Sequence, residues 1–276
     1  MVSNTEPIPV KRIIRRMRGS SQSFMVQGTD DRSYVMKCAD NPQGTRTLIN
    51  EWIVGELLMR FGICTPQIRV LVLEGTTEGM ERLYFTIGDT ERNVEGRFHI
   101  GSQCPVSPDT TAIYDFLPSR LLSRVINLAD FASVLVLDKW LCHIDRRQTV
   151  FVREPDPDGS SIFKAYFIDH GLCFAGSRWE LDVRPHGMYI DAGVYSRLNL
   201  TEHTLHALSA LHIIEEDYMS DVVSSFPQEW LSEGDDAALA NLLESLQRRR
   251  RKVASLVEQC VREISSRGVS PHASPI

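Results

Sequence analysis

The sequence lacks the features that mark membrane-spanning and secreted proteins. No stretch approaches the roughly 20 consecutive apolar residues of a membrane-spanning helix. Residues 1–19 also lack the apolar core of a signal peptide, so we expect a cytoplasmic location and no membrane partner. The six cysteines form no C-x-x-C pair, which argues against a zinc ribbon and against a module held together by disulfides. They are Cys38, Cys64, Cys104, Cys142, Cys173 and Cys260.

A surplus of positive charge is also missing. Lysine and arginine number 30 against 36 aspartates and glutamates, which gives a net charge of −6. This balance argues against a protein that coats nucleic acid or anionic membrane. No repeat with a period of about 20 to 50 residues is present, which argues against a solenoid. The composition, 42% apolar and 24% charged, is that of a globular protein with one or two packed units.

Alternating apolar and polar residues in the first third predict strands around a single helix. We expect strands over residues 10–17, 23–27, 32–38, 67–73 and 82–87. The polar stretch 88–97 is interpreted as a loop. Thr45 or Thr47 is expected to begin the helix. Its apolar face carries Ile49, Trp52, Ile53 and Leu57.

From about residue 105 the pattern becomes mainly helical. Residues 128–142 read as a core helix. A strand pair is expected at 148–153 and 162–168, joined by turn residues 154–159. Apolar positions from 239 to 264 predict one long helix.

This order of elements predicts an α+β protein with two lobes. The smaller, β-rich lobe with one helix spans residues 1–104, and the larger, mainly helical lobe spans 105–266. Residues 267–276 are expected to form a loose tail. Two lobes imply a cleft between them, where a ligand would bind.

Three features of the smaller lobe are suited to an anionic ligand. Lys37 shares a strand face with Val35, a costly arrangement on a dry face unless an anion meets it. Glu51 lies on an apolar side of the helix and needs a cation, for which Lys37 is the nearest candidate. The loop formed by Gly19, Ser20, Ser21 and Gln22 offers the backbone N–H groups that cover a phosphate tail. Taken singly, a snorkelling lysine, a helix-start glutamate and an ordinary hairpin turn remain open alternatives.

Two acidic residues of the larger lobe form the strongest pattern. Asp145 lies in DKWLCHIDRRQTVF, and Asp169 follows 24 positions later in Ile168-Asp169-His170-Gly171. Each comes just after an apolar segment, which suits one base that orients a hydroxyl and one ligand for Mg²⁺. Either residue alone would pass for a capping aspartate. The chain has no G-x-x-x-x-G-K-[ST] motif, which excludes a Walker-type nucleotide site.

In this order, RGSSQSFMV, YVMK, NPQGTRTLINE, DKWLCHIDRRQTVF and FIDHGLCF resemble the HipA-like kinase family, which has a protein-kinase-like fold. The resemblance covers residues 10 to about 195. It implies a phosphotransferase that uses ATP and Mg²⁺. The γ-phosphoryl group would pass to a hydroxyl, of Ser or Thr in a protein or of a small molecule.

The resemblance also implies a role for each of the residues above. Lys37 would contact the α- and β-phosphates, and Glu51 would hold Lys37. Asp145 would orient the acceptor hydroxyl, Asp169 would bind Mg²⁺, and Arg147 would stabilise the developing negative charge. The phosphates would be covered by Gly19, Ser20, Ser21 and Gln22.

The chain departs from the family pattern beside Asp145. Kinases usually carry a metal-binding Asn five residues after the catalytic Asp, and Val150 stands there. Gln148 is the nearby amide and is taken as a second candidate metal ligand. His143 stands where related sequences often have Asn. A degenerate kinase that acts as a nucleotide-binding or regulatory interaction module is therefore the alternative function.

Two further patterns receive structural interpretations. His203, His206 and His212 lack the spacing of a two-histidine zinc motif on a helix. The basic run 248–252 is flanked by apolar helical positions, so a solvated helix face is favoured over a nucleic-acid contact.

Overall fold

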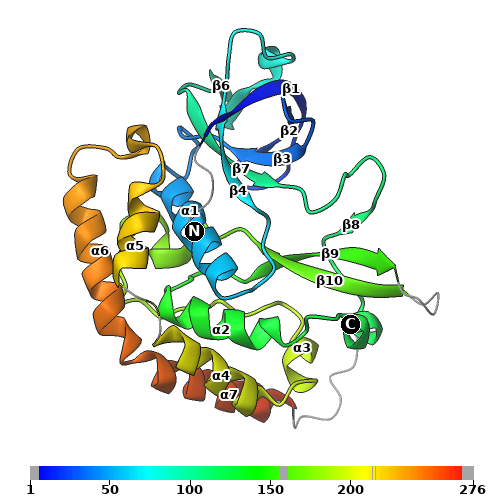
Figure 1. The fold of residues 1–276 in the computed structure, drawn as a ribbon, viewed down its shortest axis with the longest axis vertical. Coiled ribbons are helices and arrows are strands. Elements are labelled where there is room, and N and C mark those ends of the chain that lie inside the picture. The colour runs from blue at the N-terminus through cyan, green and yellow to red at the C-terminus, as the bar shows by residue number, and fades with distance from the viewer. Residues whose placement is uncertain (1–5, 156–160, 213, 215, 269–276) are drawn as a thin grey trace.

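The computed structural model of the chain describes residues 6–155, 161–212, 214 and 216–268. A small β-rich lobe is followed by a larger, mainly helical lobe (Figure 1). The predicted α+β organisation is confirmed.

The smaller lobe is built around a closed barrel with the strand order β1–β2–β3–β7–β4. Neighbouring strands are antiparallel except β1 and β4, which pair in parallel and close the barrel. A separate antiparallel hairpin is formed by β5 and β6. The strands are β1 (Ile8–Arg16), β2 (Phe24–Gly28), β3 (Ser33–Lys37), β4 (Ile68–Val72), β5 (Tyr84–Ile87), β6 (Thr90–Asn93) and β7 (Phe98–Gln103).

The alternation of side chains along the strands builds the barrel core. Phe24 and Val26 on β2, like Tyr34 and Met36 on β3, are fully buried. They belong to an apolar cluster separate from the core of the larger lobe. Because side chains alternate along a strand, Lys37 extends to the opposite face from Met36. The same alternation that fills the barrel therefore directs Lys37 out of it.

The prediction of a loop over residues 88–97 is wrong at residues 90–93, which form β6. The strand β7 was not predicted. All four residues of β6 are exposed, so this strand has no apolar face for the sequence to reveal. In β7, Gly101 lies opposite Arg69 of β4, where an added Cβ would come 2.6 Å from Leu71 Cδ1. Gly101 thus lets β4 and β7 approach closely, at the cost of the strand pattern.

The helix α1 (Arg46–Arg60) packs into the core of the larger lobe. It is apolar on most sides, which is typical of a buried helix. Trp52 Nε1 donates to Ser225 Oγ at 2.9 Å, and the Tyr218 hydroxyl donates to the Glu56 carbonyl oxygen at 3.0 Å. The one helix inserted between the barrel strands is therefore fixed to the C-terminal helices.

The larger lobe contains a three-stranded sheet with the order β10–β9–β8. The predicted strand pair is confirmed, and its register runs from Gln148 opposite Ile168 to Pro155 opposite Ser161. Of the predicted turn 154–159, residues 156–159 lie outside the described part. The strands and helices are β8 (Ile113–Tyr114), α2 (Asp130–Trp140), β9 (Gln148–Pro155), β10 (Ser161–Ile168), α3 (Gly193–Ser196), α4 (Leu200–Leu211), α5 (Glu216–Ser224), α6 (Asp235–Arg250) and α7 (Val253–Gly268).

The predicted single C-terminal helix is wrong, because the chain turns at residues 251–252. Both α6 and α7 bury apolar residues in one core, including Leu242 on α6 and Val257 on α7. The turn lets α7 pack against α2 and α4, while α6 runs beside α5, as Figure 1 shows. Of the predicted tail, residues 267–268 belong to α7 and 269–276 lie outside the described part.

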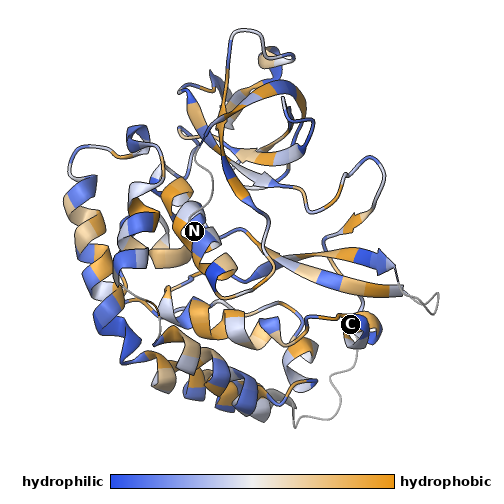
Figure 2. Cartoon of the chain, viewed as in Figure 1, coloured by the Kyte–Doolittle hydropathy of each residue, from blue (hydrophilic) through white to orange (hydrophobic). Residues whose placement is uncertain are grey.

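The helices differ in how hydrophobic they are. Figure 2 shows mainly hydrophobic colouring along α1 and α2, and mixed colouring along α6 and α7. Among the residues that the structure describes, no helix combines the length and the apolar content needed to cross a membrane.

Candidate active site

Three charged side chains that are remote in the sequence meet where β3, α1 and the end of β10 come together. Lys37 Nζ forms an ion pair with Glu51, and it lies 2.8 Å from Asp169 Oδ1. The side chain of Glu51 is 3% exposed, whereas that of Asp169 is 39% exposed. Glu51 is thus a buried support for Lys37, while the Asp169 carboxylate remains open to a ligand.

The electrostatics of this group keep both members of the Lys37–Asp169 pair charged. Burial alone would lower the pKa of Lys37, but the carboxylates of Glu51 and Asp169 outweigh it and hold this pKa above its ordinary value. Burial likewise opposes the charged form of Asp169, yet Lys37 lowers the pKa of that carboxyl to about 2. A fixed ammonium therefore stands beside a fixed carboxylate, and the carboxylate is the more exposed of the two.

Asn50, which was not predicted as a site residue, holds the segment after Asp169 in place. Its Nδ2 donates to the carbonyl oxygens of Gly171, Cys173 and Gly176 at 2.8, 3.0 and 3.1 Å. Its Oδ1 accepts from Trp179 Nε1 at 2.8 Å, and Asn50 is fully buried. An amide on the apolar side of a buried helix was the signal that could have revealed it.

Glu51 contacts the same segment directly. Its Oε1 accepts a hydrogen bond from the Gly171 backbone N–H at 2.9 Å. Asp169 has a positive φ of 59°, an unfavourable conformation for a residue with a Cβ that clusters at functional sites. One helix, α1, therefore fixes both the partner of Lys37 and the backbone next to Asp169.

Asp145 lies in the loop between α2 and β9. Its carboxylate Oδ1 accepts from the Arg146 backbone N–H at 2.7 Å, and its carbonyl oxygen accepts from Gly187 N–H at 3.0 Å. Asp145, Gln148 and Ile168 line one cleft of about 330 Å³. The loop is thus held by its backbone, and the half-buried carboxylate is available to a molecule in the cleft.

The position of Arg147 corrects the role expected from the sequence. Its guanidinium forms an ion pair with Asp138 of α2 and is 1% exposed. It also donates to the Ile168 carbonyl oxygen at 3.0 Å and lies 2.8 Å from His170 Nδ1. Arg147 therefore fastens the Asp145 loop to the end of β10, and its charge is already paired rather than directed to a phosphate.

Arg146 is the exposed arginine beside Asp145. It lines the same cleft as Asp145. Among the residues that the structure describes, its guanidinium makes no hydrogen bond or ion pair. Arg147 also lines this cleft, but its guanidinium is paired with Asp138.

Gln148 lies beside Asp169, which is the position that a second metal ligand would need. It is the first residue of β9 and pairs with Ile168, the last residue of β10. Its Nε2 donates to Asp169 Oδ2 at 2.7 Å. Val150, which stands at the usual Asn position, pairs with Tyr166 farther along the ladder. The strand thus brings the amide to Asp169 two positions earlier than the family pattern expects.

The loop between β1 and β2 is only partly free to cover a ligand. Gly19 and Ser20 are exposed, and Ser20 Oγ accepts from Gln43 Nε2 at 3.0 Å. Gln22 donates its backbone N–H to the Gly19 carbonyl oxygen at 3.2 Å, and its side-chain amide bonds both backbone groups of Thr86. Ser21 Oγ lies 3.0 Å from Ser23 Oγ. Gln22 therefore anchors the loop, and Gly19 and Ser20 form its exposed part.

The surroundings of the histidines around α4 and of the basic run 248–252 can be described from their contacts. Of the described residues, one set of three side chains has ligand atoms close enough to share a metal ion, and it contains Asp138, His143 and Cys173. Asp138 is already paired with Arg147, and the three histidines around α4 are not in this set. In the basic run, Arg248 pairs with Glu244 at 3.0 Å. Arg249 and Arg250 also donate to backbone carbonyl oxygens of this chain, so the part of the run at the end of α6 has partners within the molecule.

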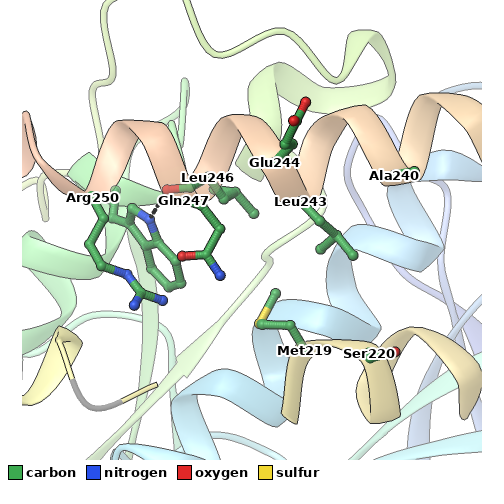
Figure 3. A pocket seen from close by; sticks show the side chains of 9 residues that line it. Met219, Ser220, Ala240, Leu243, Glu244, Leu246, Gln247 and Arg250 are labelled. Carbon is green, nitrogen blue, oxygen red and sulfur yellow. Dashed lines mark hydrogen bonds between the residues drawn. The ribbon is translucent and has the colours of Figure 1, made fainter. Parts of the chain in front are cut away.

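A second hollow lies between α5 and α6, apart from these residues. It measures about 260 Å³, and Met219 and Leu243 face each other across it (Figure 3). Arg250 lies near one end, over the Trp140 ring. None of its lining residues lines the Asp145 cleft.

Comparison with known proteins gives one family and a common fold. The family model described as HipA-like kinase matches residues 10–256. The crystal structure of the Golgi casein kinase matches with a TM-score of 0.52 at 14% identity, covering 95% of this chain and 75% of that chain. A crystal structure of the Golgi casein kinase with Mn/ADP bound has a TM-score of 0.48 at 14% identity, covering 96% and 75%. No curated protein matches the sequence. The first structure confirms the predicted kinase-like fold.

Proposed function

The chain belongs to the family of HipA-like kinases, and on this premise we propose that it transfers the γ-phosphoryl group of ATP to a hydroxyl group. The observation that carries the proposal is the contact of Lys37 with both Glu51 and Asp169. A lysine that serves only the structure needs one carboxylate partner, whereas Lys37 has two. The second partner, Asp169, is the more exposed of the two carboxylates. The charges fit a triphosphate with its divalent ion.

Lys37 binds the triphosphate in this proposal. Its ammonium is held by the buried Glu51 and lies at the end of β3, on the face away from the barrel core. An ammonium fixed before binding needs no reorganisation when phosphate oxygens arrive. Gly19 and Ser20 offer backbone N–H groups above the phosphates, and Gln22 keeps their loop tied to β5.

Asp169 and Gln148 are the residues that would hold Mg²⁺. The donor set fits this ion, because Mg²⁺ prefers carboxylate and carbonyl oxygens and keeps several waters. Gln148 Nε2 lies 2.7 Å from Asp169 Oδ2. Rotation of the Gln148 amide by about 180° exchanges its nitrogen and oxygen, which places two oxygens side by side. When bound, Mg²⁺ would neutralise charge on the β- and γ-phosphates.

Asp145 acts on the acceptor. Its carboxylate faces the cleft, where it accepts the proton of the acceptor hydroxyl as that oxygen bonds to the γ-phosphorus. The bond between the γ-phosphorus and the bridging oxygen breaks at the same centre, and the electron pair leaves with ADP. Arg146 lines the cleft and meets the charge of the transferring group.

A binding module without transfer activity is the second candidate, and Val150 at the usual Asn position favours it. The position of Gln148 weakens that argument, because this amide takes up the place next to Asp169. The two candidates differ in turnover and agree in nucleotide binding.

Incubation with γ-labelled ATP and Mg²⁺ tests the proposal. We expect the purified protein to release or transfer labelled phosphate, and Asp145→Asn to lose transfer at least about a hundredfold while binding ATP with nearly unchanged affinity. ATP binding without turnover in the unaltered protein would favour the binding module. Turnover that persists in Asp145→Asn would remove Asp145 from its role.

A further inference from the structure

His170, the residue after Asp169, is a buried polar side chain to which the proposed transfer chemistry gives no role. It is 2% exposed. Its Nδ1 lies 2.8 Å from Arg147 Nη1, and its Nε2 lies 3.2 Å from Thr65 Oγ1. Each ring nitrogen therefore has a partner, and the two partners come from distant parts of the chain.

The partners of His170 decide which ring nitrogen carries the proton. A guanidinium only donates hydrogen bonds, so Nδ1 must accept from Arg147. The Thr65 hydroxyl donates to the Phe167 carbonyl oxygen at 2.9 Å, which leaves the Thr65 oxygen to accept from Nε2–H. The imidazole is therefore neutral, with its proton on Nε2, and each hydrogen bond from Arg147 to Phe167 has one donor and one acceptor.

The Arg147 end of this chain of hydrogen bonds lies in the loop between α2 and β9. The same Nη1 that bonds His170 donates to the Ile168 carbonyl oxygen at 3.0 Å. The guanidinium is itself fixed by its ion pair with Asp138, and both side chains are 1% exposed. Arg147 therefore holds the residues on both sides of Asp169, one through a carbonyl oxygen and one through a ring.

The Thr65 end belongs to segment 61–67, which joins α1 to β4. This segment bonds both backbone groups of Phe167. The Cys64 carbonyl oxygen accepts from the Phe167 N–H at 2.9 Å, and Thr65 Oγ1 donates to the Phe167 carbonyl oxygen. The segment is thus fixed to the end of β10, and it follows directly on α1, the helix that carries Glu51.

The backbone conformation of Asp169 requires support from its surroundings. Its φ of 59° is unfavourable for a residue with a Cβ, and such a conformation persists when the surrounding structure fixes it. Lys37 contacts the Asp169 carboxylate, and Glu51 contacts the Gly171 N–H beyond His170. The His170 ring connects these contacts with the loop between α2 and β9.

We propose that His170 is a positioning residue that fixes the Asp169 carboxylate relative to Asp145. It acts through its two hydrogen bonds, to Arg147 and to Thr65, so the placement of Asp169 depends on the segment between α1 and β4. The inference rests on the proposed function. A phenylalanine would occupy a similar space but would leave a buried Arg147 N–H without its partner. The imidazole supplies an acceptor and a donor on one rigid ring, so it makes both contacts in a single orientation.

Conservative substitutions of Thr65 test the positioning role. Thr65→Val keeps the shape of the side chain and removes the hydroxyl, whereas Thr65→Ser keeps the hydroxyl. Binding of a fluorescent ATP analogue is measured at increasing Mg²⁺, together with kcat and KM for ATP at saturating Mg²⁺. We expect Thr65→Val to raise the Mg²⁺ concentration for half-maximal binding about tenfold and to lower kcat about tenfold, as loss of a contact behind a metal ligand does. KM should change little, because Lys37 is untouched, and Thr65→Ser should stay close to the unaltered protein.

Controls separate this role from a loss of stability. The half-maximal Mg²⁺ concentration and KM do not depend on the amount of folded protein. Thr204→Val is the matched control, because Thr204 Oγ1 likewise donates to a backbone carbonyl oxygen, that of Leu200 at 2.8 Å, and lies on α4; it should leave both quantities unchanged. Nitrogen NMR of the histidine rings adds a direct signature. The ring whose signals disappear in His170→Phe should carry its proton on Nε2 and none on Nδ1.

The outcomes separate the positioning role from the transfer reaction itself. An unchanged Mg²⁺ requirement in Thr65→Val overturns the positioning role, as does an equal shift in Thr204→Val or a proton on Nδ1 of His170. If the unaltered protein binds ATP with Mg²⁺ without turnover, the transfer reaction fails, and the Mg²⁺ requirement of Thr65→Val still decides the positioning role. Absence of Mg²⁺-dependent ATP binding in the unaltered protein defeats the proposed function and the positioning role with it.

Discussion

At the scale of single residues, the two arginines after Asp145 have opposite surroundings. Arg147 is buried against Asp138, while Arg146 is exposed in the cleft. We expect Arg147→Ala to destabilise the protein by about 3–5 kcal/mol, because it leaves a buried carboxylate without its partner. Arg146→Ala should change stability by less than about 0.5 kcal/mol, yet lower transfer by about a hundredfold. Urea unfolding and ATP turnover measure the two effects.

The opposite result would contradict the structural role of Arg147 and the transfer role of Arg146. A stable, fully folded Arg147→Ala variant with reduced transfer would restore Arg147 as the cation of the cleft. Arg147→Lys serves as the milder variant, because it keeps the charge beside Asp138 and removes the bidentate geometry.

Gln148 offers a second test at this scale. We expect Gln148→Leu to raise the Mg²⁺ concentration needed for half-maximal ATP turnover by about tenfold or more, because it deletes an oxygen next to Asp169. Gln148→Glu keeps an oxygen there and should stay closer to the original requirement. An unchanged Mg²⁺ requirement in Gln148→Leu would exclude this residue as a ligand.

A site residue can be predicted from the sequence when its residue type alone indicates what it must contact. A charged residue on an apolar face, such as Lys37 or Glu51, signals a missing partner, and the partners were found together. Asn50 gives a weaker signal, because an amide has no charge to compensate and its acceptors are backbone carbonyls. The orientation of Arg147 depended on Asp138, nine positions earlier, and a run of two arginines does not say which one turns inward.

At the scale of elements, α1 is the part of the molecule on which the site depends. Its N-terminal residue Arg46 forms an ion pair with Asp235 at the start of α6, and the Arg46 guanidinium lies 4.5 Å from the Trp179 ring centroid. Asp235 is 4% exposed, so this pair is partly shielded from solvent. The contact ties Glu51 to the C-terminal helices as well as to Lys37.

A double-mutant cycle on Arg46 and Asp235 tests this anchor. We expect Arg46→Ala and Asp235→Ala each to destabilise the protein, and the pair to show a coupling free energy of about 2 kcal/mol, as charge-assisted hydrogen bonds usually do. The measurement is the free energy of unfolding of the four proteins in urea. Additivity within about 0.5 kcal/mol would mean that the two residues act separately.

Elements were predictable from the sequence where a face is apolar. The pairs of strands around Lys37 and before Asp169 have alternating patterns, and both were found. The polar hairpin strand β6 has none, and the glycine in β7 hides a strand that depends on close packing with β4. The break between α6 and α7 was missed because an apolar seam continues through a turn as readily as through a helix.

At the scale of the whole molecule, there are two separate apolar cores, and β4 contributes to both, with Ile68 and Val70 in one and Leu71 in the other. The smaller lobe also contains a buried titratable group, His99 of β7, whose Nδ1 accepts from the Ala39 backbone N–H at 3.1 Å. Burial lowers the pKa of His99 to about 4. In the unfolded chain this imidazole takes up a proton below about pH 6.5.

The sign of the resulting pH dependence follows from these two states. Between pH 6.5 and 4 the unfolded chain binds more protons at this position, so the free energy of unfolding falls as the pH falls. From pH 6.5 to 5 the loss from His99 amounts to about 2 kcal/mol. We expect His99→Asn, which keeps an acceptor for Ala39, to lose about 2 kcal/mol less between pH 7 and 5 than the unaltered protein. Urea unfolding at both pH values measures the difference, and an equal loss in both proteins would contradict it.

In the proposed site, Lys37, Asp145 and Asp169 act on one triphosphate and its metal ion. The most direct measurement is a crystal structure with Mg²⁺ and a non-hydrolysable ATP analogue. We expect Lys37 Nζ within hydrogen-bond distance of the α- and β-phosphates, an Asp169 oxygen about 2.1 Å from Mg²⁺, and the γ-phosphate facing Asp145. A nucleotide bound elsewhere, such as in the hollow between α5 and α6, with Lys37 still paired only to its carboxylates, would contradict it.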